Sequence, residues 1–116
     1  MIHRLDDPAV IKWYTNENIQ CEEYYDNNKR HRMNGPAVIL YRINGMIEDE
    51  EYFENDMRHR INEPAVISYY PNGVVKSEEY YENNKRHRVD GPAIILYNDD
   101  HTKESAKYFV NGKFKN

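Results

Sequence analysis

The chain has 116 residues, of which 31% are charged and 39% are apolar, and its formal net charge is −4. A chain of this length forms one domain with a modest core, and so polar a composition predicts a thin core on one side of a sheet. The negative net charge argues against a nucleic-acid-binding or anionic-membrane surface, because both need an excess of Lys and Arg.

Cysteine content and hydropathy bear on the location of the protein. Cys21 is the single cysteine, so it has no partner for an internal disulfide and no companion for a cysteine-based metal site. The chain has neither an apolar run of transmembrane length nor an N-terminal signal pattern. We therefore expect a soluble protein in the cytoplasm.

Two residue types recur at a constant step of 28 positions. Four of the five histidines, His3, His31, His59 and His87, and four of the five prolines, Pro8, Pro36, Pro64 and Pro92, follow this step. The chain therefore divides without insertions into four units, residues 3–30, 31–58, 59–86 and 87–116. Equal units stack with one geometry and each buries a face that it cannot bury alone, so we expect a single repeat domain over residues 1–116.

Each unit predicts the same elements in the same order, as the second unit illustrates. The apolar run 36–41 begins with proline, which suits the first residue of a strand. The Asn-Gly pair at 44–45 predicts a hairpin with a type I′ turn. A strand with two glutamates and two aromatic residues follows at 50–53. A second tight turn is expected at 55–56, where Asn, Asp and Gly replace one another between units and all tolerate left-handed φ.

These elements together predict the fold class. Residues with β-branched or aromatic side chains are frequent between the turns, and no helical period is present. The predicted fold is all-β: an antiparallel β-meander built of four 28-residue β-hairpin repeats, as a single sheet or a shallow solenoid. The sequence leaves open whether a unit forms two long strands or three short ones.

Side-chain alternation assigns the faces of the predicted strands. Ala37, Ile39 and Tyr41 share one face, which we take as the core. A two-residue turn places Ile39 opposite Glu50, and Tyr52 on the face of Ala37. Glu50 fits this face poorly, so it needs a position at the rim or a polar partner. The equivalent core positions are Ala9, Ile11 and Trp13, then Ala65, Ile67 and Tyr69, then Ala93, Ile95 and Tyr97.

The second turn brings a basic segment against the preceding strand. A two-residue turn pairs Tyr25 with Arg30, Asp26 with Lys29, Tyr24 with His31 and Glu23 with Arg32, and the third unit repeats the pattern up to Glu79 with Arg88. Each pair of opposite charges, or of a ring and a cation, contributes roughly 0.2 to 1 kcal/mol. The basic segment is therefore expected to find its partners within the sheet.

Six arginines and three aromatic residues are the candidate binding residues: Arg30, Arg32, Arg58, Arg60, Arg86, Arg88, Tyr25, Phe53 and Tyr81. A stripe of guanidinium groups matches phosphate or carboxylate groups. The favoured alternative is that Glu23, Glu51 and Glu79 neutralise the arginines inside the sheet. The aromatic residues share the arginine face and make it amphipathic, as an interaction surface is.

Neither a metal site nor a catalytic site is expected. The four repeated histidines occur once per unit, at least a repeat width apart, and we interpret them as structural residues that stack on the adjacent tyrosine and bond to the backbone. Adjacent glutamates such as Glu50 and Glu51 point to opposite faces, which is wrong for a cooperating acid and base. The chain has no serine or cysteine in a nucleophile motif, no glycine-rich phosphate loop and no cofactor motif.

The repeated markers are His-Arg, Asp-Gly-Pro-Ala, and a Tyr-rich strand followed by Asn-Asn-Lys, and they span the whole chain. In these markers the chain resembles the MORN-repeat variants, including the type abundant in giant viruses and phages, and more loosely the YwqK-like antitoxin family. The resemblance implies an array of β-hairpins that acts as an interaction module, with no catalytic residues and no cofactor.

Two functions from different classes follow from these patterns. The leading hypothesis is a non-enzymatic repeat module for protein–protein interaction, of viral or phage type, that docks a partner protein or a second copy of the chain. The alternative is a sequestering or inhibitory protein that binds a small anionic ligand such as a nucleotide through the arginine-rich face. No membrane partner is expected, and nucleic acid is disfavoured by the net charge.

Overall fold

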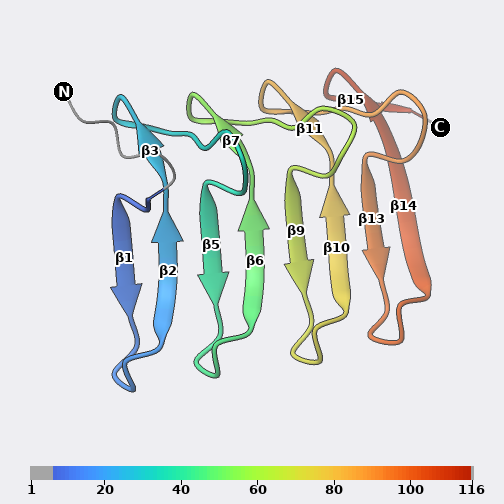
Figure 1. Ribbon diagram of the computed structural model, residues 1–116. Helices are drawn as coiled ribbons and strands as arrows, with labels where there is room; N and C mark the ends of the chain where they lie inside the picture. Colours follow the sequence, from blue (N-terminus) through green and yellow to red (C-terminus); the bar gives the residue numbers. More distant parts are fainter. Residues whose placement is uncertain (1–6, 116) are drawn as a thin grey trace.

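The computed structural model describes residues 7–115, which form antiparallel β-structure with no helix (Figure 1). The predicted all-β antiparallel meander is confirmed. The molecule measures 47 × 35 × 16 Å, so its shortest dimension accommodates one layer of sheet with side chains on both faces. Within residues 7–115 no helix has the length and apolar character needed to cross a membrane.

Nine strands form one open sheet, and their order across the sheet is their order along the chain (Figure 1). Short two-stranded hairpins, which are not part of this sheet, lie between some of these strands in the sequence. The order is β1 (Val10–Trp13), β2 (Ile19–Glu23), β5 (Val38–Tyr41), β6 (Ile47–Glu51), β9 (Val66–Tyr69), β10 (Val75–Glu79), β13 (Ile94–Tyr97), β14 (Lys103–Val110) and β15 (Lys113–Lys115).

Short two-stranded hairpins extend the sheet at one end. They are β3 (Tyr25–Asp26) with β4 (Lys29–Arg30), β7 (Phe53–Glu54) with β8 (Met57–Arg58), and β11 (Tyr81–Glu82) with β12 (Lys85–Arg86). In the last unit β14 is continuous and forms the corresponding hairpin directly with β15. Each of the first three units therefore contributes two sheet strands and one short hairpin, which settles the strand count that the sequence left open.

The first turn of each unit differs from the predicted type I′ turn. Gly45 has a positive φ of 91° but Asn44 does not, and the Gly45 N–H donates to the Arg42 carbonyl at 2.8 Å. This is a type I turn followed by one left-handed residue. Glu48 then lies unpaired in a bulge, which restores the register, so the predicted pairing of Ile39 with Glu50 is confirmed. The corresponding left-handed residues in the other units are Glu17, Gly73 and His101.

The second turn of each unit is the type I′ turn. Asn55 and Asp56 both have positive φ, 51° and 66°. The same holds at residues 27–28, 83–84 and 111–112, which confirms the prediction that left-handed φ selects Asn, Asp and Gly there. The Asp56 N–H donates to the Arg30 carbonyl at 3.0 Å, so each hairpin is also bonded to the one before it.

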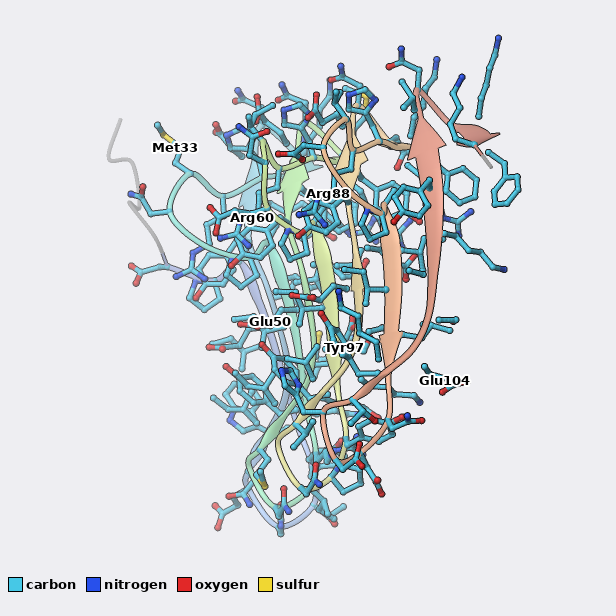
Figure 2. All side chains as sticks on the ribbon, turned by 90° about the vertical axis from the view of Figure 1, so that its right-hand side faces the viewer. Met33, Glu50, Arg60, Arg88, Tyr97 and Glu104 are labelled. Atoms are coloured by element: carbon cyan, nitrogen blue, oxygen red, sulfur yellow. The ribbon has the colours of Figure 1, made fainter. Side chains whose placement is uncertain are left out.

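Buried residues lie on both faces of the sheet, so the predicted restriction of the core to one face is wrong: Val66 and Phe53, on the face opposite to Ala37, are 9% and 8% exposed. Ala37, Ala65 and Ala93 are fully buried, and Ile39 packs in one cluster with Tyr24 and Phe53. At the β1 edge the prediction is wrong, because Trp13 is 58% exposed and Ala9 is exposed as well. Among the described residues no unit lies outside β1 to cover these positions. Figure 2 shows the sheet from its β14 edge, with side chains on both faces.

Candidate binding surfaces

Three of the candidate arginines form a ladder with aromatic rings of successive units, which we call the arginine ladder. Arginine and ring alternate in the order Arg30, Phe53, Arg58, Tyr81, Arg86 and Phe109. Each guanidinium carbon lies between 5.4 and 5.9 Å from the ring centroids beside it. At this distance a cation is attracted by the ring quadrupole, so the ladder joins neighbouring hairpins.

Each arginine of the ladder also forms an ion pair with a glutamate of the sheet. Arg58 lies 3.0 Å from Glu51, and the equivalent pairs are Arg30 with Glu23 at 3.8 Å and Arg86 with Glu79 at 3.7 Å. The predicted neutralisation by these glutamates is confirmed for these three arginines. The arginine side chains are 40–44% exposed whereas the carboxylates are 17–25% exposed, so the guanidinium groups form the outer surface.

The other three arginines occupy a different place. Arg60 stacks on the ring of Tyr52 at 3.9 Å and donates to the Pro64 carbonyl at 3.1 Å. The equivalent stacks are Arg32 on Tyr24 and Arg88 on Tyr80. The predicted pairing of Glu23 with Arg32, and of Glu79 with Arg88, is therefore wrong. The reason is that β4 ends at Arg30 and β12 at Arg86, after which the chain leaves the hairpin.

The two arginine sets lie on opposite faces of the sheet. Glu50 and Glu51 are consecutive in β6 and so point to opposite faces. Arg58 pairs with Glu51, which defines the Glu51 face. Arg60 stacks on Tyr52, which follows Glu51 in the chain and so lies on the same face as Glu50. We call this the Glu50 face. The nine candidate residues are therefore not one site.

The candidate aromatic residues differ in accessibility. Phe53 is 8% exposed and belongs to the core, so it supports the ladder and does not offer its ring to a partner. Tyr25 is exposed, and its hydroxyl donates to Glu23 at 2.8 Å. Tyr81 is half-buried, and its hydroxyl donates to Glu79 at 3.2 Å. Two of the three aromatic candidates thus remain at the surface.

A hollow of about 390 Å³ opens on the Glu51 face beside the ladder. Lys12, Arg30 and Arg58 supply cationic groups to its lining, and Leu40 supplies an apolar side chain. Buried Cys21 also lines it, and burial raises the pKa of this thiol, which keeps it in the unreactive neutral form. The hollow therefore has an amphipathic lining with cations at the surface.

The repeated histidines bond to the backbone, as predicted, and each partner lies in the second turn of the same unit. The Nδ1 atom of His59 accepts the Asn83 N–H at 2.9 Å, and His31 and His87 accept the equivalent groups of Asn55 and Asn111. The tyrosine faces on which stacking was expected are covered by arginines. His3 lies outside the described residues. Among residues 7–115 no three His, Cys, Asp or Glu side chains are placed to hold a metal ion.

A half-buried carboxyl group on the Glu51 face was not identified from the sequence. Asp49 accepts a hydrogen bond of 2.8 Å from Ser68 and lies next to Glu51. Burial, and then the hydrogen bond and charge of Glu51, raise the pKa of Asp49 to about 7. The sequence signal that could have revealed it is a difference between units: Asp49 is the only acidic residue at a position that holds Cys21, Ser77 and Ser105 in the other units.

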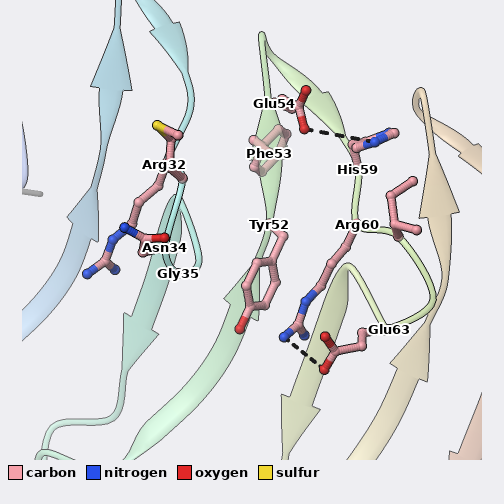
Figure 3. A pocket seen from close by; sticks show the side chains of 11 residues that line it. Arg32, Asn34, Gly35, Tyr52, Phe53, Glu54, His59, Arg60 and Glu63 are labelled. Carbon is pink, nitrogen blue, oxygen red and sulfur yellow. Dashed lines mark hydrogen bonds and ion pairs between the residues drawn. The ribbon is translucent and has the colours of Figure 1, made fainter.

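Two clefts on the Glu50 face were also not predicted from the sequence. The first, of about 390 Å³, has Tyr52 between the loops that carry Arg32 and Arg60 (Figure 3). The second, of about 210 Å³, contains Tyr80 and Arg88, one unit further along. The signal was an apolar residue after each His-Arg pair, for which the strand pattern offers no core position: Leu5, Met33, Ile61 and Val89.

Comparison of the chain with protein-family models, with curated proteins and with solved structures found no match.

Proposed function

We propose that this protein is a non-enzymatic repeat module that binds a partner protein through the arginine ladder on the Glu51 face. The observation that carries the proposal is the repetition of exposed Arg30, Arg58 and Arg86, of which the first two line an amphipathic hollow. Arginine and aromatic side chains are enriched at protein interfaces, where the guanidinium group combines a cation, a planar surface and several donors. An acidic segment of a partner with apolar side chains suits this surface.

The alternative of a small anionic ligand is less well supported. Each guanidinium group of the ladder already lies 3.0–3.8 Å from a carboxylate, which reduces the positive potential that a nucleotide would need. A protein segment can use the apolar lining as well as the exposed donors. The two functions separate in a thermal-shift assay, because a nucleotide that binds only the native state raises the melting temperature.

Self-association is also less well supported than a separate partner. The outer part of β14 carries Lys103, Glu104 and Lys107, all exposed, and charged residues on an edge strand oppose pairing with a second chain. Size-exclusion chromatography with light scattering distinguishes the cases. A monomer in isolation agrees with the proposal, whereas a stable dimer would assign the surface to a second copy.

The test of the proposal is a binding experiment with three variants. Crosslinking and affinity capture identify a partner, and purified components then give its dissociation constant. We expect the variant with Arg30, Arg58 and Arg86 changed to Ala to lose binding by at least about tenfold, and the corresponding Lys variant to lose part of it.

The matched control removes three other cations from the hairpins at the same end of the sheet. Lys29, Lys85 and Lys113 are exposed and lie outside the ladder. Their triple change to Ala has the same effect on net charge and should leave binding almost unaltered. The ladder would be contradicted as the binding surface if the arginine variant bound the partner as tightly as the unchanged protein does. It would also be contradicted if the lysine control lost as much affinity as the arginine variant.

A cytoplasmic location and a MORN-like repeat class belong to the same proposal. The free thiol of Cys21 suits a reducing compartment. The resemblance to repeat modules of giant viruses and phages supports a role in recognition, and so does the flat single-layer sheet.

A further inference from the structure

The Tyr52 cleft and the Tyr80 cleft are two copies of one feature. In the first, Tyr52 lies between the loop of residues 32–35 and the loop of residues 59–63, which form its walls (Figure 3). In the second, Tyr80 lies with Asn62 and residues 87–90. The loop 59–63 thus contributes to both clefts, which follow one another across the stack of units.

The spacing of the clefts is set by the sheet. Tyr52 follows β6 and Tyr80 follows β10, and one strand, β9, lies between these two in the sheet. Neighbouring strands are about 4.8 Å apart, so the clefts repeat at roughly 9.6 Å. A ligand that fills both clefts with equivalent groups must repeat at this distance.

A polyproline II helix has this repeat. It rises about 3.1 Å per residue with three residues per turn, so equivalent side chains recur on one side every 9.3 Å or so. Side chains on one face of a β-strand recur at roughly 6.7 Å, a repeat too short to place one side chain in each of two clefts that are roughly 9.6 Å apart. An α-helix is about 10–12 Å wide, too wide to enter between walls spaced at roughly 9.6 Å.

The walls carry apolar side chains that the fold does not use. Met33, Ile61 and Val89 are equivalent in the repeat, and their exposed fractions are 87%, 56% and 80%. A row of exposed aliphatic side chains beside tyrosine rings provides the apolar contact that proline and leucine side chains need. The extended backbone of a ligand would pass over these residues and place a side chain in each cleft.

The charge at the clefts defines the ligand further. Arg60 and Arg88 are stacked on tyrosines and paired with Glu63 and Asp90, and their side chains are only 26% exposed. The acidic members of these pairs are 63% and 86% exposed, and Glu54 and Glu82 add further carboxylates to the lining. The outermost charges at both clefts are therefore negative and complement a basic ligand.

We propose that the Tyr52 and Tyr80 clefts bind successive three-residue turns of a basic polyproline II segment in a partner protein. An apolar side chain at every third position enters each cleft, and Lys or Arg side chains between them face the carboxylates. This surface lies on the Glu50 face, so it is a second interaction surface that does not depend on the arginine ladder.

The test uses a defined peptide and the whole protein. The probe is a labelled peptide of four Leu-Lys-Pro units, and its isomer with the same residues but irregular leucine spacing is the first comparison. Fluorescence anisotropy should show about tenfold tighter binding of the regular peptide, because only this peptide fills both clefts at once. Equal affinities, or no binding of the regular peptide, would overturn the proposal. So would stronger binding of a helical peptide that carries the same leucines.

Variants of the protein locate the site. Ile61→Ser should weaken binding of the regular peptide about fivefold or more, since it removes an apolar side chain from the Tyr52 cleft, on the loop that also reaches the Tyr80 cleft through Asn62. Ile43→Ser is the matched control, because Ile43 is also 56% exposed but lies in a first turn at the other end of the strands. An equal effect of the two changes would contradict the assignment.

The charge contribution is tested in the same way. Glu54→Gln with Glu82→Gln should weaken binding and reduce its salt dependence, whereas Glu17→Gln with Glu104→Gln, at exposed positions of the first turns and bulges, should do neither. The Arg30, Arg58 and Arg86 triple variant should bind the peptide as the unchanged protein does. Failure of the ladder proposal and failure of the cleft proposal are thus distinguishable.

Discussion

The hydroxyl of Tyr69 donates a hydrogen bond of 2.5 Å to the carboxylate of Glu50 on the neighbouring strand. Glu50 lies on β6 and Tyr69 on β9, so this bond joins two consecutive units across the core face. The same contact joins Tyr41 to Glu22 and Tyr97 to Glu78. A half-buried carboxylate that fits an apolar face poorly is therefore retained because the next unit supplies its donor.

Removing that donor should destabilise the protein. Tyr69→Phe leaves Glu50 half-buried without its hydroxyl partner, and we expect the free energy of unfolding to fall by about 1 to 3 kcal/mol in urea denaturation. Tyr108→Phe is the control, since Tyr108 is 47% exposed. Equal losses in the two variants would show that the hydrogen bond to Glu50 contributes nothing beyond the loss of a surface hydroxyl.

The same tyrosines should make the protein sensitive to alkali. Burial and the hydrogen bond to Glu78 raise the pKa of Tyr97 to about 12. Burial and a hydrogen bond to a glutamate, Glu22 and Glu50 respectively, also raise the pKa of Tyr41 and of Tyr69. A folded-state pKa above the unfolded value of about 10 means that the folded protein holds the proton more tightly.

This contribution to stability is complete below pH 10 and is lost as the pH rises from about 10 to about 12. Urea denaturation at a series of pH values should show the fall. Tyr97→Phe has no proton to lose at this site, so its stability should fall less steeply over the same range. An identical pH dependence in both proteins would contradict the assignment to Tyr97.

Much of the fold could be predicted because the repeat exposes the requirements of the backbone. The exchange of Asn, Asp and Gly at the second turn reports left-handed φ directly, and Asn55 and Asp56 have it. The first turn could not be predicted in detail, since a three-residue loop followed by a bulge at Glu48 gives the same strand register as a two-residue loop. The pairing of Ile39 with Glu50 is therefore correct although the turn type is not.

The candidate surfaces were less predictable, because they arise where units meet. Arg30 and Arg32 are two positions apart and look equivalent in an extended strand, but β4 ends at Arg30. Arg32 therefore leaves the hairpin and stacks on Tyr24. The clefts depend on how far the loop of one unit stands from the next, a distance that no local pattern of residues encodes.

The carboxyl group of Asp49 should produce a pH dependence near neutrality. Burial and the neighbouring Glu51 raise its pKa from 3.8 to about 7. The folded protein therefore holds this proton between about pH 4 and pH 7 while the unfolded chain releases it, so stability should fall as the pH rises through that window.

Asp49→Asn should remove this dependence and keep an acceptor for Ser68. Because the group is partly exposed, we expect the free energy of unfolding of the variant to be only about 1 kcal/mol higher than that of the unchanged protein at pH 8. Near pH 4 the two values should be equal. Asp99→Asn changes an exposed carboxylate by the same chemistry and should have little effect at either pH. Chemical denaturation at the two pH values measures both, and a variant that is less stable at pH 8 would refute the argument.

The type I′ turns provide a test of the backbone argument. Asn83 has a φ of 51°, and its N–H donates to His59 at 2.9 Å, a bond that a change of side chain leaves in place. Asn83→Ala forces an alanine into the left-handed region and should cost about 1 kcal/mol, whereas Asn83→Gly adopts that region freely and should cost less. Glu82→Ala, on the adjacent strand position, controls for loss of a side chain from the hairpin. Thermal or urea denaturation measures the stability of the variants. Equal stability of the alanine and glycine variants at position 83 would mean that left-handed φ is not what selects Asn, Asp and Gly at this turn.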